Sequence, residues 1–130
     1  MKDIAIKEHH LYNKVFTRGE RFVGRYISVH ILPDFTAKKR MLAHPQKIYT
    51  NRVGLSVTKK IGGAVQRNRA KRLIRAAFRM LKSTETLKTG KLIVISARPT
   101  IIEKSSLDVL SELSYAMKKL EMTVEASEVQ

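Results

Sequence analysis

The chain has 130 residues, of which 43% are hydrophobic, so it is long enough for one globular domain and too short for two independent ones. Its formal net charge of +15 at neutral pH attracts polyanions, which makes nucleic acid or an anionic membrane surface the candidate partner. The absence of cysteine excludes disulfides, thiolate zinc sites and cysteine nucleophiles.

The N-terminal part of the chain predicts a helix followed by a strand. Apolar residues at helical spacing predict the helix over Ile6–Arg18, and Gly19 is a common residue just past a helix end. Alternating residues predict a single strand over Arg21–Leu32. One face of this strand would be apolar and carry Val23, Ile27, Val29 and Ile31. The other face would carry Phe22, Tyr26, Ser28 and His30.

The middle of the chain predicts a loop, a strand and a long helix. The segment Pro33–Lys47 has two prolines and little periodicity, so we expect a loop, to which we assign no role. A second strand is expected over Arg52–Val57. Gly62 and Gly63 then interrupt the pattern before a helix that runs from about Ala64 to Lys82.

The C-terminal third predicts one more strand and one more helix. Lys91–Ala97 is a short apolar run suited to a buried strand. Ser105 or Ser106 can cap a final helix, with Asp108 in its first turn and an inward face formed by Leu110, Leu113, Met117 and Leu120. Residues 1–120 would form the single domain, and the acidic segment Glu121–Gln130 would be a frayed tail.

The predicted long helix carries many cations and no anions. Between positions 52 and 82 there are ten basic residues and no Asp or Glu. Helical geometry places Ala70, Leu73, Ile74, Ala77 and Leu81 on one face. A separate face carries Arg67, Lys71, Arg72, Arg75, Arg79 and Lys82. A charged face is often only a solvated surface, but like charges four residues apart repel, so this pattern favours phosphate binding.

Aromatic residues suggest single-stranded RNA as the nucleic acid. Tyr12 and Phe16 are one turn apart on the first predicted helix, and Tyr26 and His30 share a strand face with Phe22. Rings of this kind stack on unpaired bases while cations hold the backbone. The alternative, that the rings belong to the core, stays open for Tyr12, Phe16 and Phe22, whereas we expect Tyr26 and His30 to be exposed.

The stretch GLSVTKKIGGAVQRNRAKRLIRAAFR, which contains the arginine-rich RNR segment, resembles the signature of the bacterial ribonuclease P protein subunit. The resemblance extends to VFTRG, RYISVHILP and KLIVISARP in the family's order. It implies an α+β (α/β) two-layer sandwich, in which about three helices pack on a four-stranded sheet. The resemblance further implies likeness to a domain of some ribosomal proteins and a left-handed βαβ crossover.

The resemblance also implies a function and a set of site residues. The subunit would bind a catalytic RNA and the 5′ leader of precursor tRNA, and so assist removal of the leader. Contacts with the RNA subunit are expected from Lys59, Lys60, Arg67, Asn68, Arg69, Arg72 and Arg79. Contacts with the leader are expected from Tyr12, Phe16, Tyr26, His30, Ser56, Lys71 and Arg75. His30 stands where the family often has tyrosine.

No catalytic centre is expected in this chain. Asp3, Asp34 and Asp108 are scattered, no carboxylate cluster suits two-metal phosphodiester cleavage, and the four histidines do not form a metal-ligand pattern. The catalytic centre and most of the Mg²⁺ would then belong to the RNA subunit. A ribosomal or ribosome-assembly protein is the alternative function, and the missing carboxylates disfavour a protein-only nuclease.

The sequence also predicts where the protein acts. No apolar run approaches the roughly 20 residues of a membrane-spanning helix, and the N-terminus lacks the apolar region of a signal peptide. We therefore expect a cytoplasmic protein with ribonuclease P RNA and precursor tRNA as partners. No membrane contact and no stable protein partner are implied.

Overall fold

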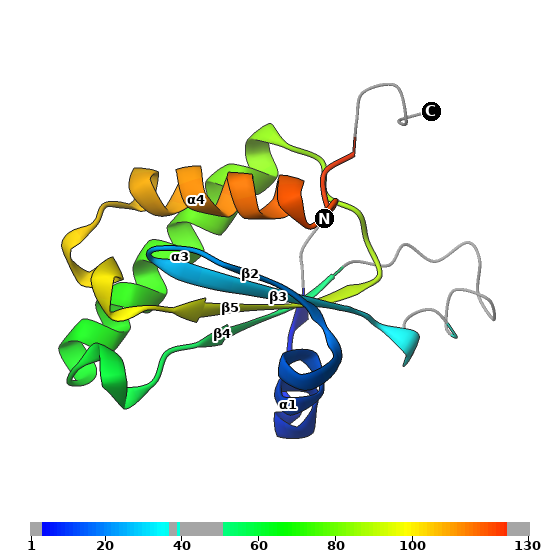
Figure 1. The fold of residues 1–130 in the computed structure, drawn as a ribbon, viewed down its shortest axis with the longest axis horizontal. Coiled ribbons are helices and arrows are strands. Elements are labelled where there is room, and N and C mark those ends of the chain that lie inside the picture. The colour runs from blue at the N-terminus through cyan, green and yellow to red at the C-terminus, as the bar shows by residue number, and fades with distance from the viewer. Residues whose placement is uncertain (1–3, 37–38, 40–50, 125–130) are drawn as a thin grey trace.

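A computed structural model describes residues 4–36, 39 and 51–124 of the chain (Figure 1). The helices in this part are α1 (His9–Arg18), α3 (Ala64–Thr84) and α4 (Ser106–Lys119), with short 3₁₀ helices η1 (Lys59–Ile61) and η2 (Pro99–Glu103). The strands are β1 (Ile4–Ala5), β2 (Glu20–Val23), β3 (Ile27–Pro33), β4 (Arg52–Ser56) and β5 (Lys91–Ala97).

The strands form one mixed sheet in the order β1-β4-β5-β3-β2. β4 and β5 are parallel neighbours joined through α3, whereas β3 is antiparallel to both β5 and β2. The two-residue strand β1 extends the edge beside β4, in addition to the four strands predicted. The predicted α+β fold is therefore confirmed.

The two faces of the sheet are covered differently. α3 and α4 lie on one face (Figure 1), where they bury Ile74, Leu81 and Leu113 against Ile93 and Ile95 of β5. α1 lies on the opposite face, where Val15 joins a smaller core made by Ile6, Leu32, Leu92 and Val94. Because this core gathers around Leu32 and Leu92, α1 covers one end of that face.

The predicted single strand over Arg21–Leu32 is wrong, because residues 24–26 form a turn that divides it into the antiparallel strands β2 and β3. The turn reverses the alternation that a continuous strand would have. Val23 pairs with Ser28 on the α1 face and is 56% exposed, while Phe22 pairs with Val29 and packs against the α3–α4 core. Both residues thus lie on faces opposite to those predicted.

Two positions near this hairpin require glycine, because a Cβ atom there would clash with neighbouring atoms. A Cβ atom on Gly24 would lie 2.1 Å from Oε1 of Glu112, which accepts hydrogen bonds from the N–H groups of Tyr26 and Ile27 at 2.9 Å each. Gly19 follows α1 with a φ of −78°, so it does not use a left-handed conformation. A Cβ there would lie 2.6 Å from the Val15 carbonyl oxygen and 2.7 Å from that of Ile31.

The remaining predicted elements occur with small shifts. β5 has the predicted bounds, α3 continues two residues further to Thr84, and α1 begins at His9 because Ile6 continues the edge pairing by donating to the Val53 carbonyl. Ser105 caps α4 in a reciprocal capping box with Asp108. Leu113 and Met117 are fully buried as predicted, whereas Leu110 and Leu120 are partly buried.

The predicted acidic tail begins with residues that are anchored to the fold. Met122 is 1% exposed, and its carbonyl accepts from the N–H of Lys88, while the N–H of Val124 donates to Thr86. Residues 121–124 are therefore not frayed as predicted, and residues 125–130 lie outside the described part.

The loop predicted over Pro33–Lys47 is described only in part. Pro33 belongs to β3, and residues 37–38 and 40–47 are not described.

Candidate nucleic-acid interface

The long helix α3 has the two faces that its sequence predicts. Ala70, Ile74, Ala77 and Leu81 are fully buried, and Leu73 is partly buried against the same core. Its other face carries the predicted cations, of which Arg72, Arg75, Arg79 and Lys82 are exposed and Arg67 and Lys71 half-buried. Within the described residues, no carboxylate lies within 4.0 Å of Arg67, Lys71, Arg72, Arg75 or Arg79. This face therefore has charge available for an external anion.

A cleft of about 510 Å³ runs along β4, between α1 and the basic face of α3. Tyr12 of α1 lines one side of it, and the other side carries Lys71, Arg75, Arg79 and Lys82. We call this the cationic cleft. The structure thus brings Tyr12 together with Lys71 and Arg75, three of the residues expected to contact the leader. Arg79, expected to contact the RNA subunit, also lies here.

The cleft depends on a close approach between Tyr12 and Gly54. A Cβ atom on Gly54 would lie 2.4 Å from the Tyr12 hydroxyl oxygen and 2.6 Å from Cζ. The Tyr12 hydroxyl donates to the Ile6 carbonyl oxygen at 3.5 Å, which holds the ring along the strand. Glycine at position 54 therefore lets an aromatic ring of α1 lie directly on β4.

We expect Gly54→Ala to destabilise the fold by about 1–3 kcal/mol, because the added methyl group overpacks the Tyr12 ring. Urea denaturation of Gly54→Ala, Tyr12→Ala and the double variant measures this coupling. In the Tyr12→Ala background the added methyl group should cost much less. An equal cost in both backgrounds would show that Gly54 is needed for a reason other than Tyr12.

The strand register extends this surface across the sheet. Gly54 of β4, Val94 of β5 and His30 of β3 form one row, and Ser56, Ser96 and Ser28 form the next. Side chains in one row share a face, and Val94 packs with α1, so both rows lie on the α1 face. Tyr12, His30 and Ser56, which were predicted separately, therefore share this face.

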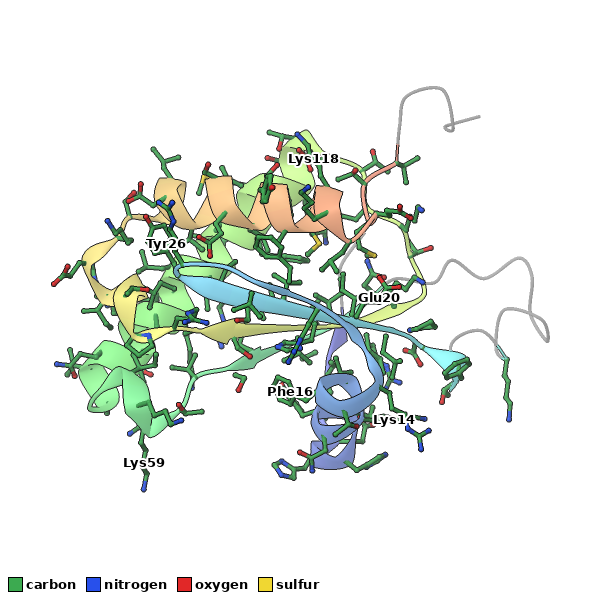
Figure 2. All side chains as sticks on the ribbon, in the orientation of Figure 1. Lys14, Phe16, Glu20, Tyr26, Lys59 and Lys118 are labelled. Carbon is green, nitrogen blue, oxygen red and sulfur yellow. The ribbon has the colours of Figure 1, made fainter. Side chains whose placement is uncertain are left out.

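Phe16 joins this face from α1, where it projects beneath the sheet (Figure 2). Its ring meets His30 edge-on, with ring centroids 4.8 Å apart and an interplanar angle of 80°. Phe16 is 37% exposed, so part of the ring remains accessible. Tyr12 on Gly54 and Phe16 on His30 thus place two α1 rings on one row of the sheet, on either side of Val94.

The surroundings of His30 favour the uncharged form of its ring. Burial lowers its pKa below the usual value of 6.5, and the charge of Arg21, its partner on β2, lowers the pKa further. Its Nδ1 atom is buried and has no hydrogen-bond partner among the described residues. A neutral imidazole with a partly exposed ring can stack on a base without adding charge to the site.

Tyr26 does not lie with these residues. It belongs to the hairpin turn and packs against the α3–α4 core, well away from Phe16 (Figure 2). Lys104 of the segment after η2 lies over its ring, with Nζ 5.2 Å from the ring centre. The predicted grouping of Tyr26 with His30 is wrong, because it assumed that one strand continued through the turn.

Five of the seven residues expected to contact the RNA subunit lie on η1 or in the first turns of α3, whereas Arg72 and Arg79 lie further along the helix. Lys59 and Lys60 are exposed on η1, and Asn68 and Arg69 are exposed in the first turns of α3. Arg69 also has internal partners, since Nε donates to the Ile102 carbonyl at 3.1 Å and Nη2 to that of Lys104 at 3.5 Å. Sequence periodicity gives no signal for such contacts, because η2 is more than thirty residues away.

Arg52, the first cation of the basic stretch, is paired with a buried acidic side chain. Arg52 forms a bidentate salt bridge with Asp34, in which Nε lies 2.7 Å from Oδ2 and Nη2 lies 2.9 Å from Oδ1. The Asp34 side chain is 3% exposed. The hydrogen bonds that Asp34 accepts from the guanidinium raise the pKa of Arg52. Arg52 therefore joins β4 to the residue after β3, and its charge is already balanced by Asp34.

The described residues show no sign of two other kinds of site. No group of three or more His, Asp or Glu side chains in this part of the chain is placed to hold a metal ion. Similarly, no helix there is both long and apolar enough to cross a bilayer.

Comparisons with known proteins all point to one family. The Ribonuclease P family model matches residues 1–121. The ribonuclease P protein component of Geobacillus kaustophilus is 35% identical over 118 residues, which cover 91% of this chain and 87% of that protein. The component from Clostridioides difficile is 30% identical over 120 residues, covering 92% and 94%. The solved Staphylococcus aureus RNase P protein superposes with a TM-score of 0.72 at 26% identity, covering 95% and 100%.

Proposed function

The chain belongs to the ribonuclease P protein family, the protein components of an endoribonuclease complex, and from this we propose that it binds the ribonuclease P RNA and the 5′ leader of precursor tRNA. The observation that carries the proposal is the cationic cleft beside two accessible aromatic rings. A single-stranded leader needs both features, because its phosphates repel one another and its bases are unstacked. The complex would act in the cytoplasm.

In the proposed arrangement, α3 holds the leader backbone and α1 holds its bases. Lys71 and Arg75 would neutralise phosphates from one side of the cleft, with Arg79 beside them. Phe16 and Tyr12 would receive bases on the other side, and His30 would support the Phe16 ring. Ser56, on the same face of β4, would offer a hydroxyl group for hydrogen bonding.

The protein's contribution would be electrostatic and positional. The described residues do not gather the carboxylates that a two-metal centre requires. Mg²⁺ ions held by the RNA subunit would supply the activated water for cleavage. Cations on α3 would lower the repulsion between the catalytic RNA and its RNA substrate, which raises substrate affinity.

Reconstitution tests this function. Precursor tRNA is incubated in Mg²⁺ with the protein alone, with ribonuclease P RNA alone, and with both. We expect no cleavage by the protein alone and a higher kcat/KM with both components than with RNA alone. Cleavage by the protein alone would identify it as a nuclease, and an unchanged kcat/KM would contradict its role as the RNase P subunit.

We expect Phe16→Ala to weaken binding of precursor tRNA by about five- to a hundredfold, because one stacked base contributes about 1–3 kcal/mol. Binding of mature tRNA, which lacks the leader, should hardly change. Both affinities are measured on the same reconstituted complex.

Tyr115→Ala serves as the matched control for Phe16→Ala. Tyr115 is an exposed aromatic residue on α4, across the sheet from α1, and is 53% exposed. The Tyr115→Ala substitution should leave the affinities for precursor tRNA and mature tRNA unchanged. If Phe16→Ala reduces the affinities for precursor and mature tRNA equally, Phe16 supports the fold or the RNA interface and the leader assignment is wrong.

A further inference from the structure

We propose that the hairpin turn between β2 and β3 and the η2 region form a second RNA-docking surface, whose contacts are Arg25, Arg98 and Lys104. This hairpin–η2 platform would dock a base-paired segment of the RNA subunit. The inference rests on the proposed function but concerns residues outside the cleft and outside the RNR segment. None of the three has a role in the leader site.

Hydrogen bonds between distant segments hold the platform together. The Thr100 hydroxyl donates to the Arg25 carbonyl, and the N–H of Arg98 donates to the Tyr26 carbonyl at 2.9 Å. These bonds join the hairpin turn to η2, although the two segments are about seventy residues apart in sequence. The backbone that carries Arg25 and Arg98 is therefore fixed before any RNA binds.

Arg69 of α3 ties the same platform to the basic helix. Its guanidinium donates to the carbonyl oxygens of Ile102 and Lys104, one at the end of η2 and one just after it. The hairpin turn, η2 and the start of α3 accordingly lie together at one end of the molecule (Figure 1). Arg69 is thus a positioning residue for Lys104, in addition to any contact that it makes with RNA.

The platform keeps a net positive charge. Arg25 and Arg98 are exposed and Lys104 is half-exposed. Two nearby carboxylates accept hydrogen bonds from the backbone but keep their charge: Glu112 accepts from the Tyr26 and Ile27 N–H groups, and Asp108 accepts from the Ser105 N–H at 2.9 Å. Glu103 of η2 is a third carboxylate. Together with Arg69, which contacts η2, and with Lys59 and Lys60 of the neighbouring η1, this end of the molecule has six cations against three carboxylates.

The chemistry of the platform favours paired RNA over an unpaired strand. Unpaired bases are held by accessible rings, but Tyr26 packs against the core and lies beneath Lys104. The nearby ring of Tyr115 on α4 already contacts the Phe22 ring edge-on and has Lys119 over it. Paired RNA instead presents phosphates and 2′-hydroxyl groups, which arginine and lysine bind without stacking. The platform also continues the surface formed by Lys59 and Lys60 of η1, which packs near η2. Both observations point to the RNA subunit and away from the leader.

The test compares two charge-matched triple variants. One combines Arg25→Ala, Arg98→Ala and Lys104→Ala, and the control combines Lys88→Ala, Lys118→Ala and Lys119→Ala, which removes three exposed lysines elsewhere. Lys118 lies on α4, away from the hairpin turn (Figure 2). Affinity for ribonuclease P RNA alone is measured from 50 to 200 mM salt. Denaturation midpoints establish that both variants fold.

We expect the platform variant to reduce the slope of log affinity against log salt by about three, since removing one phosphate contact reduces it by about one. The control should reduce the slope by much less. Equal reductions in the two variants would overturn the proposal. Precursor tRNA affinity is also measured on complexes assembled at saturating RNA subunit. If the platform variant loses affinity only for precursor tRNA, the platform binds the substrate and the proposal is overturned.

The proposal and the proposed function can fail separately. If the unaltered protein does not bind ribonuclease P RNA, the proposed function fails. If it binds and the platform variant behaves as the control does, only the platform is wrong.

The Arg69→Ala variant tests the positioning role of Arg69 separately. Without the Arg69 contacts, amide hydrogen exchange should become faster at Ile101 and Lys104, whose N–H groups form the hydrogen bonds of η2. Unchanged exchange would contradict the role given to Arg69.

Discussion

Raising the salt concentration from 50 to 200 mM should weaken binding of this protein to ribonuclease P RNA by about three orders of magnitude or more. The reason is counterion release, since each cation that neutralises a phosphate displaces a condensed ion from the RNA. Arg67, Arg72, Arg75 and Arg79 have no acidic partner among the described residues, and η1 adds two exposed lysines. Six or more phosphate contacts are therefore within reach of the surface described.

The measurement is a series of equilibrium titrations of the RNA at several salt concentrations. The melting temperature of the free protein is followed over the same range, so that a change in fold is not mistaken for a change in affinity. A nearly flat salt response with an intact fold would contradict the phosphate-contact interface. It would indicate that base or shape contacts supply the affinity.

Ile74→Ala should lower the free energy of unfolding by about 2–5 kcal/mol, because it leaves a cavity between α3 and the sheet. Ile74 is fully buried and packs in the same core as Ile93 and Ile95 of β5. Urea denaturation measures the loss. Because α3 also supplies one side of the cationic cleft, the variant should lose RNA binding at temperatures where it unfolds.

Arg75→Ala is the matched control, since Arg75 is the next residue on α3 but faces the cleft and is exposed. Its free energy of unfolding should change by no more than about 0.5 kcal/mol, as for most surface substitutions. Affinity for precursor tRNA should nevertheless fall. If Arg75→Ala unfolds the protein and Ile74→Ala does not, the two faces of α3 have been assigned in reverse.

Several local features could be read from the sequence because they depend on residues close together in the chain. The separation of Ile74 from Arg75 on α3 follows from helical geometry alone. The bounds of β5 follow from one short apolar run, and the cap of α4 from Ser105 and Asp108 three residues apart. The family could be identified for a similar reason, because the RNR segment is continuous in sequence.

The hairpin formed by β2 and β3 could not be predicted from local sequence spacing. The alternation over Arg21–Leu32 looks continuous, but the turn at residues 24–26 reverses which side chains face the core. That turn is held by Glu112 of α4, about eighty-five residues away. Phe22 and Tyr26 were placed with His30 for this reason, and the structure places them on the other side of the sheet.

The family, the amphipathic basic helix and the absence of cysteine chemistry all follow from the amino-acid sequence, because each is a property of composition or of local spacing. Which residues meet in the folded protein depends instead on its tertiary packing. Strand register placed Gly54 and His30 in one row, and the packing of α1 put Tyr12 and Phe16 on that row. Tertiary packing also paired Arg52 with Asp34 and Arg69 with η2, which distinguishes these two from Arg67, Arg72, Arg75 and Arg79, the arginines without an acidic partner among the described residues. Such contacts join residues far apart in the chain, and periodicity carries no information about them.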